Sequence, residues 1–595
     1  MNPRIDLQIQ ELASSCVAEL FGAQLESGNV SVQNTRKEFA GDRTVVCFPL
    51  TRHSKLAPEA TGNKLGEAMV SSASWLTGFN VVKGFLNLEV DPSYWTQWLD
   101  GDSAAADYGS APKGSAPQVM VEYSSPNTNK PLHLGHLRNN FLGHSVARIL
   151  EAAGHDVVKV QIINDRGIHI CKSMVAWQQL GNGETPESTG EKGDHFVGRY
   201  YVAFDKAFKA EVAGLVAAGM DAKQAEAEAP ILQAARTSLK KWEDNDQETV
   251  ALWKRMNSWV YKGFETTYAT MGVDFDKLYY ESNTYLVGKD KVLQGVADGL
   301  FTQREDGSVW VDLTGDGLDE KILLRSDGTA VYMTQDIGTA ILRFEDYPGL
   351  DRQIYTVGNE QEYHFKVLFL VLEKLGFGKL GKNHHLSYGM VELPEGKMKS
   401  REGTVVDADD LMDEMSRVAE QIATESGKIE GLDPSERQSV FAKVGLGALK
   451  YFLLKVDPTK GMMFDPKASI DFIGNTAPFI QFNYVRGKSI LRKAEEQRLP
   501  PAAISPVGPD EMELIQLIYA MPDIISEAAS SYNPGLVANW CYDLTKSYSS
   551  YYQDHPMLSA DNESDRALRL MLTARFTAAI KKGFHLLGID MPERM

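Results

Sequence analysis

The clearest pattern of hydrophobic and polar positions lies between residues 118 and 163. Residues 119–123 alternate, with apolar side chains on one face and Met120 and Glu122 on the other, and this period of two predicts a strand. A Ser/Pro/Asn turn follows, and apolar residues then recur with helical spacing until Gly154. Val157–Ile163 reads as a second strand. This order predicts a parallel unit of a doubly wound sheet, whose ligands bind at the carboxyl ends of the strands.

The same approach divides the rest of the chain. A helix around Ile5–Phe21 and strands near Thr44–Phe48 and Gly84–Val90 predict a small α/β domain, which a stretch of small and polar residues ends. Beyond Asp407 the pattern is helical. We therefore expect four parts: an α/β domain at 1–112, a Rossmann-like doubly wound parallel-sheet domain at 113–405 with an insertion at about 184–310, a helical stem at 406–470 and an all-α bundle at 471–595.

Composition narrows the class of protein. The 595 residues, 43% of them hydrophobic, are enough for about two to four globular domains. A net charge of -19 argues against binding to polyanions through bulk electrostatics, although local patches can still bind an RNA. The N-terminus lacks the apolar core of a signal peptide, and no run is long enough to span a membrane. We expect a cytoplasmic protein whose four separated cysteines are reduced and form no structural zinc site: Cys16, Cys47, Cys171 and Cys541.

Candidate chemistry begins where the first predicted helix begins. His133 and His136 stand three residues apart in its first turn, with Gly135 between them. A helix start offers free N–H groups and partial positive charge, and the two imidazoles add side-chain donors. Gly135 would let a flat ligand approach the backbone. These features favour a nucleotide phosphate site, while two surface histidines or half of a metal site remain the simpler alternatives.

The longer stretch around these histidines is more specific. Residues 124–139 read Ser-Ser-Pro-Asn-x-x-Lys-Pro-x-His-x-Gly-His-Leu-Arg-Asn, which resembles the first signature of class I aminoacyl-tRNA synthetases in its arginyl-tRNA synthetase form. The resemblance implies that His133, His136 and Lys130 face the phosphates of ATP as catalytic groups. It also implies that Gly135 lies against the nucleotide.

Two later segments resemble the amino-acid pocket of the same family. The first segment contains Tyr332 and Asp336, and the second contains Gln361. Each segment reads as a strand that runs into a helix. With Glu122 and Asn127 they would line an arginine pocket. A guanidinium has five donors in a planar fork and needs a carboxylate, which Asp336 supplies, while Glu122 is expected to bind the α-ammonium group. Each residue could instead be a satisfied polar group at a strand end.

A cationic segment at 395–404 resembles the second signature of class I synthetases. Its glycines and charges suit a loop that closes on a triphosphate and stabilises the leaving pyrophosphate. The resemblance implies catalytic roles for Lys397 and Lys399 and a contact of Met398 with ATP. An ordinary charged surface loop is the alternative.

This segment departs from the usual wording, because Ser400 stands where the second lysine is expected. In arginyl enzymes the lysine before the first signature is thought to replace it. The cation that stabilises pyrophosphate is therefore left open among four residues: Lys130, Lys397, Lys399 and Arg401.

The two ends of the chain extend the resemblance. Residues 37–42 and 82–88 resemble the additional N-terminal domain of arginyl enzymes, which contacts the outer corner of the tRNA. Residues 474–486 closely match a motif of the C-terminal bundle, which binds the anticodon in that family. The aromatic residues of the bundle are expected to be mostly core.

Together these features imply ATP-dependent ligation of L-arginine to tRNA(Arg) through an arginyl-adenylate. Mg²⁺ would be carried by ATP rather than by a metal site of the protein, and we expect a monomer. Two other functions stay open: a catalytically inactive synthetase-like protein that only binds tRNA, which Ser400 suggests, and a different class I synthetase or adenylyltransferase.

Overall fold

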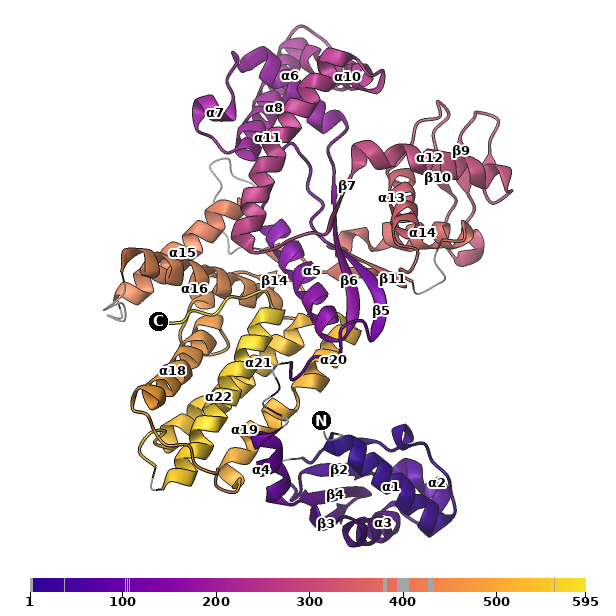
Figure 1. The fold of residues 1–595 in the computed structure, drawn as a ribbon. Coiled ribbons are helices and arrows are strands. Elements are labelled where there is room, and N and C mark those ends of the chain that lie inside the picture. The colour runs from indigo at the N-terminus through magenta and orange to yellow at the C-terminus, as the bar shows by residue number, and fades with distance from the viewer. Residues whose placement is uncertain are drawn as a thin grey trace. The chain divides into compact units, whose positions relative to one another are not determined.

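The computed structural model describes residues 4–36, 38–101, 103, 105, 107–377, 382–392, 406–425, 433–560 and 562–595. The chain forms two compact units, each built from several segments (Figure 1). The first contains Met1–Tyr108, Arg486–Met521 and Asp543–Ala579, and the second contains Gly109–Val485, Pro522–Tyr542 and Ile580–Met595. Within the described ranges, no helix is both long enough and apolar enough to cross a bilayer.

The N-terminal part of the first unit is an α/β fold, as the sequence predicts. Its helix α1 (Ile5–Phe21) begins and ends where the pattern places it. Four antiparallel strands form a sheet in the order β1-β2-β4-β3. The remaining elements are β1 (Val32–Asn34), β2 (Arg43–Val46), α2 (Thr51–Ser54), α3 (Pro58–Ser72), β3 (Leu76–Val82), β4 (Phe85–Val90) and α4 (Pro92–Asp100).

The second unit is organised around a parallel sheet of five strands in the order β12-β11-β5-β6-β7, which confirms the predicted fold class (Figure 1). The strands are β5 (Ala116–Glu122), β6 (His155–Ile163), β7 (Lys277–Tyr280), β11 (Arg352–Gly358) and β12 (Asn383–Tyr388). From β5 the chain proceeds to β6 and β7 on one side and later to β11 and β12 on the other. The order therefore reverses between β5 and β11, where doubly wound sheets bind ligands.

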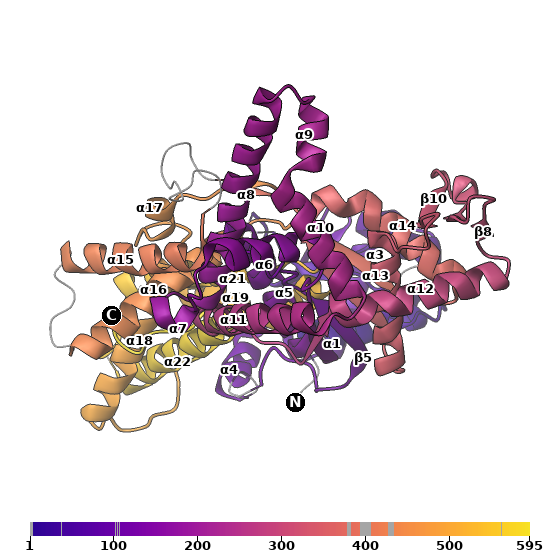
Figure 2. The same ribbon diagram turned by 90° about the horizontal axis from the view of Figure 1, so that it is seen from above.

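Helices α6 to α11 separate β6 from β7. They are α6 (Ile168–Leu180), α7 (Pro186–Thr189), α8 (Gly193–Ala217), α9 (Ala222–Glu228), α10 (Pro230–Glu243) and α11 (Gln247–Met271). Figure 2 shows α8 and α10 side by side, with α9 connecting them. Because β7 pairs with β6, the chain returns to the sheet at Lys277, inside the range 184–310 that the sequence assigns to the insertion. A strand of four residues directly after a long helix is too short for periodicity to reveal.

The segment before the arginine-pocket residues differs from its prediction. After α12 (Glu281–Ala297) the chain makes a small antiparallel sheet of β8 (Thr302–Gln303), β9 (Val309–Val311) and β10 (Lys321–Leu324). Helix α13 (Tyr332–Asp346) then starts directly. The strand predicted at the start of the segment Val331–Asp336 is wrong, because α13 already begins at Tyr332. The prediction of a strand before Gln361 is confirmed by β11, which leads into α14 (Glu362–Lys374).

The described residues beyond 406 are mainly helical, as predicted, apart from β14 (Met462–Met463), which forms a short parallel pair with β13 (Val391–Glu392). The helices are α15 (Ala408–Glu425), α16 (Pro434–Leu454), α17 (Pro466–Ser469), α18 (Ala477–Glu496), α19 (Pro509–Tyr519), α20 (Met521–Ser531), α21 (Pro534–Asp554) and α22 (Glu563–Leu586). Tyr548 is fully buried and stacks on Phe576 with ring centroids 3.8 Å apart. This aromatic residue therefore packs the core, as predicted for most of those in the bundle.

Candidate functional site

The first turn of α5 (Leu134–Ala152) is capped by the two signature histidines. The Nδ1 atom of His133 accepts the N–H of Gly135 at 3.1 Å, and Nδ1 of His136 accepts the N–H of His133 at 3.2 Å. The pair forms a reciprocal capping box, a role more often filled by Ser or Thr with Glu. A Cβ on Gly135 would lie 3.0 Å from Cε1 of His133. A side chain at position 135 would therefore crowd the histidine ring that covers it, a reason for glycine that the sequence does not reveal.

The capping bonds fix the protonation of both rings. Because each Nδ1 accepts an N–H group, each proton lies on Nε2, which is left free to donate. Burial, with Lys130 nearby, lowers the pKa of His133 to about 4. Burial and the neighbouring His133 lower the pKa of His136 well below its ordinary value. At neutral pH the pair offers two uncharged donors, and Lys130 adds a positive charge near them.

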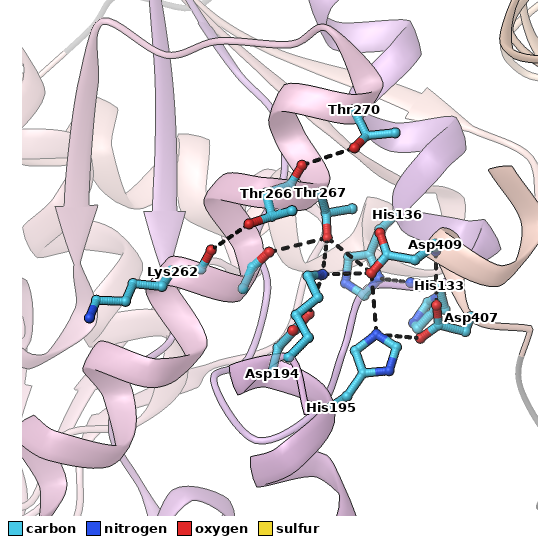
Figure 3. A network of polar contacts seen from close by, with 12 residues as sticks. His133, His136, Asp194, His195, Lys262, Thr266, Thr267, Thr270, Asp407 and Asp409 are labelled. Atoms are coloured by element: carbon cyan, nitrogen blue, oxygen red, sulfur yellow. Dashed lines mark hydrogen bonds and ion pairs between the residues drawn. The ribbon is translucent and has the colours of Figure 1, made fainter. Parts of the chain in front are cut away.

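A later segment of the chain pairs with the backbone around these histidines. Leu134 donates its N–H to the carbonyl of Val406 at 3.1 Å, and Ala408 donates to the carbonyl of Leu132 at 3.0 Å. His133 and Asp407 therefore form an isolated antiparallel bridge. Figure 3 shows His133 and His136 beside Asp407 and Asp409. The four predicted groups of the cationic segment lie outside the described residues, so their roles stay predictions: Lys397, Met398, Lys399 and Arg401.

Glu122 ends β5 at the point where the strand order reverses. It lies opposite Tyr355 of β11 and Val160 of β6, and only 6% of its surface is exposed. Its carboxylate forms an ion pair with Arg343 of α13, which is also buried. The sequence did not identify this partner. A usable signal was present, since Arg343 follows Asp336 by seven residues, which places both on one face of the helix.

The rings of two tyrosines enclose this ion pair. The guanidinium carbon of Arg343 lies 5.1 Å from the ring centroid of Tyr279 and 5.5 Å from that of Tyr355. Aromatic faces attract a cation and exclude water. Glu122 is thus held by a desolvated, specific partner.

Asp336 reaches the first turn of α14. Its Oδ2 atom lies 2.6 Å from Nε2 of His364, which joins the starts of α13 and α14. Tyr332 lies one turn before Asp336 and is 76% exposed. Gln361 is exposed in a single helical turn after β11, three residues before His364. The sequence reasoning missed His364, although it follows Gln361 in the motif that was used.

The turn after β5 is held by a side chain of α5. Ser124 adopts a positive φ of 59° and donates its N–H to Oδ1 of Asn139 at 2.6 Å. The side-chain amide of Asn139 in turn donates to the carbonyl of Thr356 in β11 at 2.6 Å. Asn139 therefore ties α5 to both strands at the switch point. Asn127, a little further along this turn, is exposed and pairs as an isolated bridge with Asn164.

Two further carboxylates lie at the start of the neighbouring helix α12. Asp165, which follows β6, accepts the N–H of Ser282 at 2.9 Å and the hydroxyl of Tyr261 at 3.0 Å. Asp165 thus caps the start of α12, which is distant in sequence. The next helix along the chain, α6, has Gly167 as its N-cap. Burial raises the pKa of Glu281, the first residue of α12, to about 7. That carboxyl group was not identified from the sequence.

The N-terminal domain contains a separate cavity of about 250 Å³. Its lining combines two cations, two phenylalanine rings and two amides, a set that suits a flat polar group next to negative charge. The lining residues are Gln33, Arg36, Glu38, Phe39, Thr44, Val82, Lys83, Phe85 and Asn87.

Two family models match this chain and agree with its parallel-sheet domain and its helical C-terminal part. Residues 106–465 match the family model described as tRNA synthetases class I (R), catalytic domain, and residues 480–595 match the DALR anticodon binding domain. The first match covers the parallel sheet with both of its halves.

Relatives resemble the chain from end to end. An arginine–tRNA ligase of Parabacteroides distasonis is 54% identical over 99% of this chain and 100% of its own length. One of Porphyromonas gingivalis is 53% identical over 99% of both chains. The solved arginyl-tRNA synthetase of Thermus thermophilus has a TM-score of 0.79 at 26% identity and covers 99% of both chains. With two matching domains in family order and full-length relatives above 50% identity, the chain belongs to the arginyl-tRNA synthetases, the arginine–tRNA ligases.

Proposed function

We propose that this chain joins L-arginine to tRNA(Arg) with Mg²⁺-ATP. A carboxylate oxygen of arginine attacks the α-phosphorus in line, the bond to the β-phosphate oxygen breaks, and pyrophosphate leaves. The terminal ribose hydroxyl of the tRNA then attacks the arginyl carbonyl and releases AMP. Positioning and electrostatics drive both steps, since neither needs a side chain as nucleophile.

One observation carries the proposal: the strand order reverses beside Glu122, and groups suited to the two substrates lie on either side of this point. Lys130 and the Nε2–H groups of His133 and His136 would bind the phosphates. Asp336 would take the guanidinium group of arginine, with Tyr332 and Gln361 beside it. Because Arg343 already pairs with Glu122, the α-ammonium group would share that carboxylate with Arg343.

This assignment also explains selectivity without a proofreading domain. Glu122 is already paired with Arg343 and Asp336 is partly exposed, so an amino acid without a guanidinium group loses chiefly the charged contact with Asp336, which costs binding energy. Neither alternative function is favoured, since close full-length relatives are arginine–tRNA ligases. A small-substrate adenylyltransferase would also have no use for the DALR anticodon binding domain.

Pyrophosphate exchange tests the function and the pocket together. With arginine, ATP and a tRNA(Arg) transcript, the wild type should incorporate labelled pyrophosphate into ATP. Asp336→Asn should raise KM for arginine by about 100-fold, since it replaces a charged hydrogen bond by a neutral one. The KM for ATP should stay within about twofold of the wild-type value. Absence of exchange would refute the ligase, and equal changes in both KM values would refute the pocket.

We propose further that the N-terminal cavity holds a base of the tRNA. Phe85 and Phe39 can stack on it, and Arg36, whose guanidinium carbon lies 5.9 Å from the Phe85 ring centroid, can reach its phosphate. Phe85→Ala should raise KM for tRNA about 10-fold or more, given about 1–3 kcal/mol for base stacking. Aminoacylation at varied tRNA concentration measures this. Leu20→Ala, a change in an exposed side chain of α1 outside the cavity lining, is the control; equal losses in both variants would exclude the cavity.

We place the reaction in the cytoplasm and in a monomer. All four cysteines are buried free thiols, which suits a reducing compartment.

A further inference from the structure

A polar network joins the insertion to the segment that pairs with His133 (Figure 3). Asp409 Oδ2 accepts from Nζ of Lys192 at 2.5 Å and lies 3.2 Å from Nε2 of His195. Asp407 lies 3.5 Å from the same ring nitrogen. Lys192 also reaches Asp194, which is fully buried, at 3.1 Å. The start of α8 therefore holds both acidic residues of the segment 406–409.

Helix α8 also contacts the first signature directly. A Cβ on Gly198 would lie 2.9 Å from Cδ of Pro131, the residue after Lys130. Helix α8 therefore packs closely against the stretch that contains Lys130. This contact lies one helical turn after the ionic contacts of His195. Two independent contacts thus connect the same helix to the two backbone segments that flank His133.

The charges in the network fit a clamp better than a metal site. Ligand atoms of Asp194, His195 and Asp409 lie within 4.8 Å of one another, a spacing that could hold a metal ion. The ammonium group of Lys192, however, already contacts both of the carboxylates. Lysine therefore supplies the cation, and the side chains brace one backbone segment against another.

We propose that Lys192 and His195 are positioning residues for the phosphate end of the ATP site. They hold Asp407 and Asp409, and the backbone of this segment in turn fixes Leu132 and Leu134 on either side of His133. They act on ATP through the backbone and not by contact. The inference rests on the proposed function and adds to it residues outside both signatures.

The protonation of the network predicts how it responds to pH. The hydrogen bond with Asp409 raises the pKa of His195 above its ordinary value. Burial by itself would raise the pKa of Asp409. Hydrogen bonds from His195 and Lys192 outweigh this effect and lower the pKa to about 2. His195 also faces Asp194, Asp407 and Lys192, and the nearby His133 and His136 are neutral. As pH rises through the pKa of His195, the clamp loses a positive charge and should loosen.

Exchange kinetics with tRNA(Arg) test this role. Lys192→Met and His195→Gln should each lower kcat/KM for ATP about 10- to 100-fold, as small misplacements of catalytic groups do, with KM for arginine nearly unchanged. Lys192→Arg should restore most of the activity. Arg199→Gln, also on α8 but paired with Glu184 and Glu191, is the matched control and should behave as the wild type.

The pH profile separates positioning from general loss of structure. In the wild type, kcat/KM for ATP should fall as pH rises through the pKa of His195, and His195→Gln should lack this fall. Thermal midpoints of all variants check folding. Unchanged ATP kinetics in both variants, or equal losses for ATP and arginine, would overturn the inference while leaving the function intact. If the wild type itself shows no exchange, the proposed function fails and the inference with it.

Discussion

Arg343→Met is expected to destabilise the protein by about 3–5 kcal/mol, the usual cost of removing one partner of a buried ion pair. The carboxylate of Glu122 would be left without its cation, in surroundings that expose only 6% of the residue. Chemical denaturation, followed by tryptophan fluorescence, measures this loss of stability. The first unfolding transition should occur at a lower denaturant concentration than in the wild type. The KM for arginine should rise as well, since Glu122 would no longer be held at the end of β5.

Two further variants make this prediction specific. In the double variant Glu122→Gln with Arg343→Met, no buried charge is left unpaired, so much of the lost stability should return while binding of arginine should not. Arg304→Met breaks an exposed pair with Glu320 and a stacking contact with Trp310, and should cost at most about 2 kcal/mol. If Arg343→Met is no more destabilising than Arg304→Met, then the Glu122–Arg343 pair contributes little.

The sheet and the first signature could be predicted because their information is local. The strand β5, the turn and helix α5 follow from alternation, turn residues and helical spacing within about forty residues. The capping histidines are also local, since each one bonds within three residues. The sequence therefore identified the phosphate end of the site, although not the tautomer that the caps impose.

The other contacts of the site are distant in sequence and could not be read from periodicity. Glu122 and Arg343 come from elements more than two hundred residues apart, and either could have been a surface charge. Lys192 and Asp409 are similarly remote. For Glu122 and Arg343, burial of both partners decides their role, and burial depends on tertiary packing.

Local reading also misplaced Tyr332. The residues Val331 to Met333 are apolar or aromatic and resemble a short strand, whereas the structure starts α13 there. The hydroxyl of Thr334 accepts the N–H of Val331 at 3.3 Å and donates to the carbonyl of Leu323. A side-chain cap of this kind determines a helix start more strongly than strand propensity does.

His133→Asn should separate the two roles of the first signature histidine. Asparagine can cap the helix with its side-chain oxygen in place of Nδ1, but it lacks a donor at the position of Nε2. The rate of pyrophosphate exchange should therefore fall by about 10²- to 10³-fold, as when one donor to developing charge is lost. The thermal midpoint should be kept. His133→Ala should lose both the rate and about 1 kcal/mol of stability, since it also removes the cap.

The acid dependence of stability gives an independent check on the neutral state of His133. Burial lowers its pKa to about 4, whereas in the unfolded chain the imidazole titrates near its ordinary value of 6.5. Between these values the unfolded state binds the proton and the folded state does not, so stability should decrease as pH falls from about 6.5 to about 4. His133→Asn should make that part of the stability profile less steep, while the buried His136 and His144, whose pKa values are also lowered, keep part of the slope. If the His133→Asn variant exchanges pyrophosphate at the wild-type rate, His133 serves as a helix cap alone. The phosphate donors must then be His136 and Lys130.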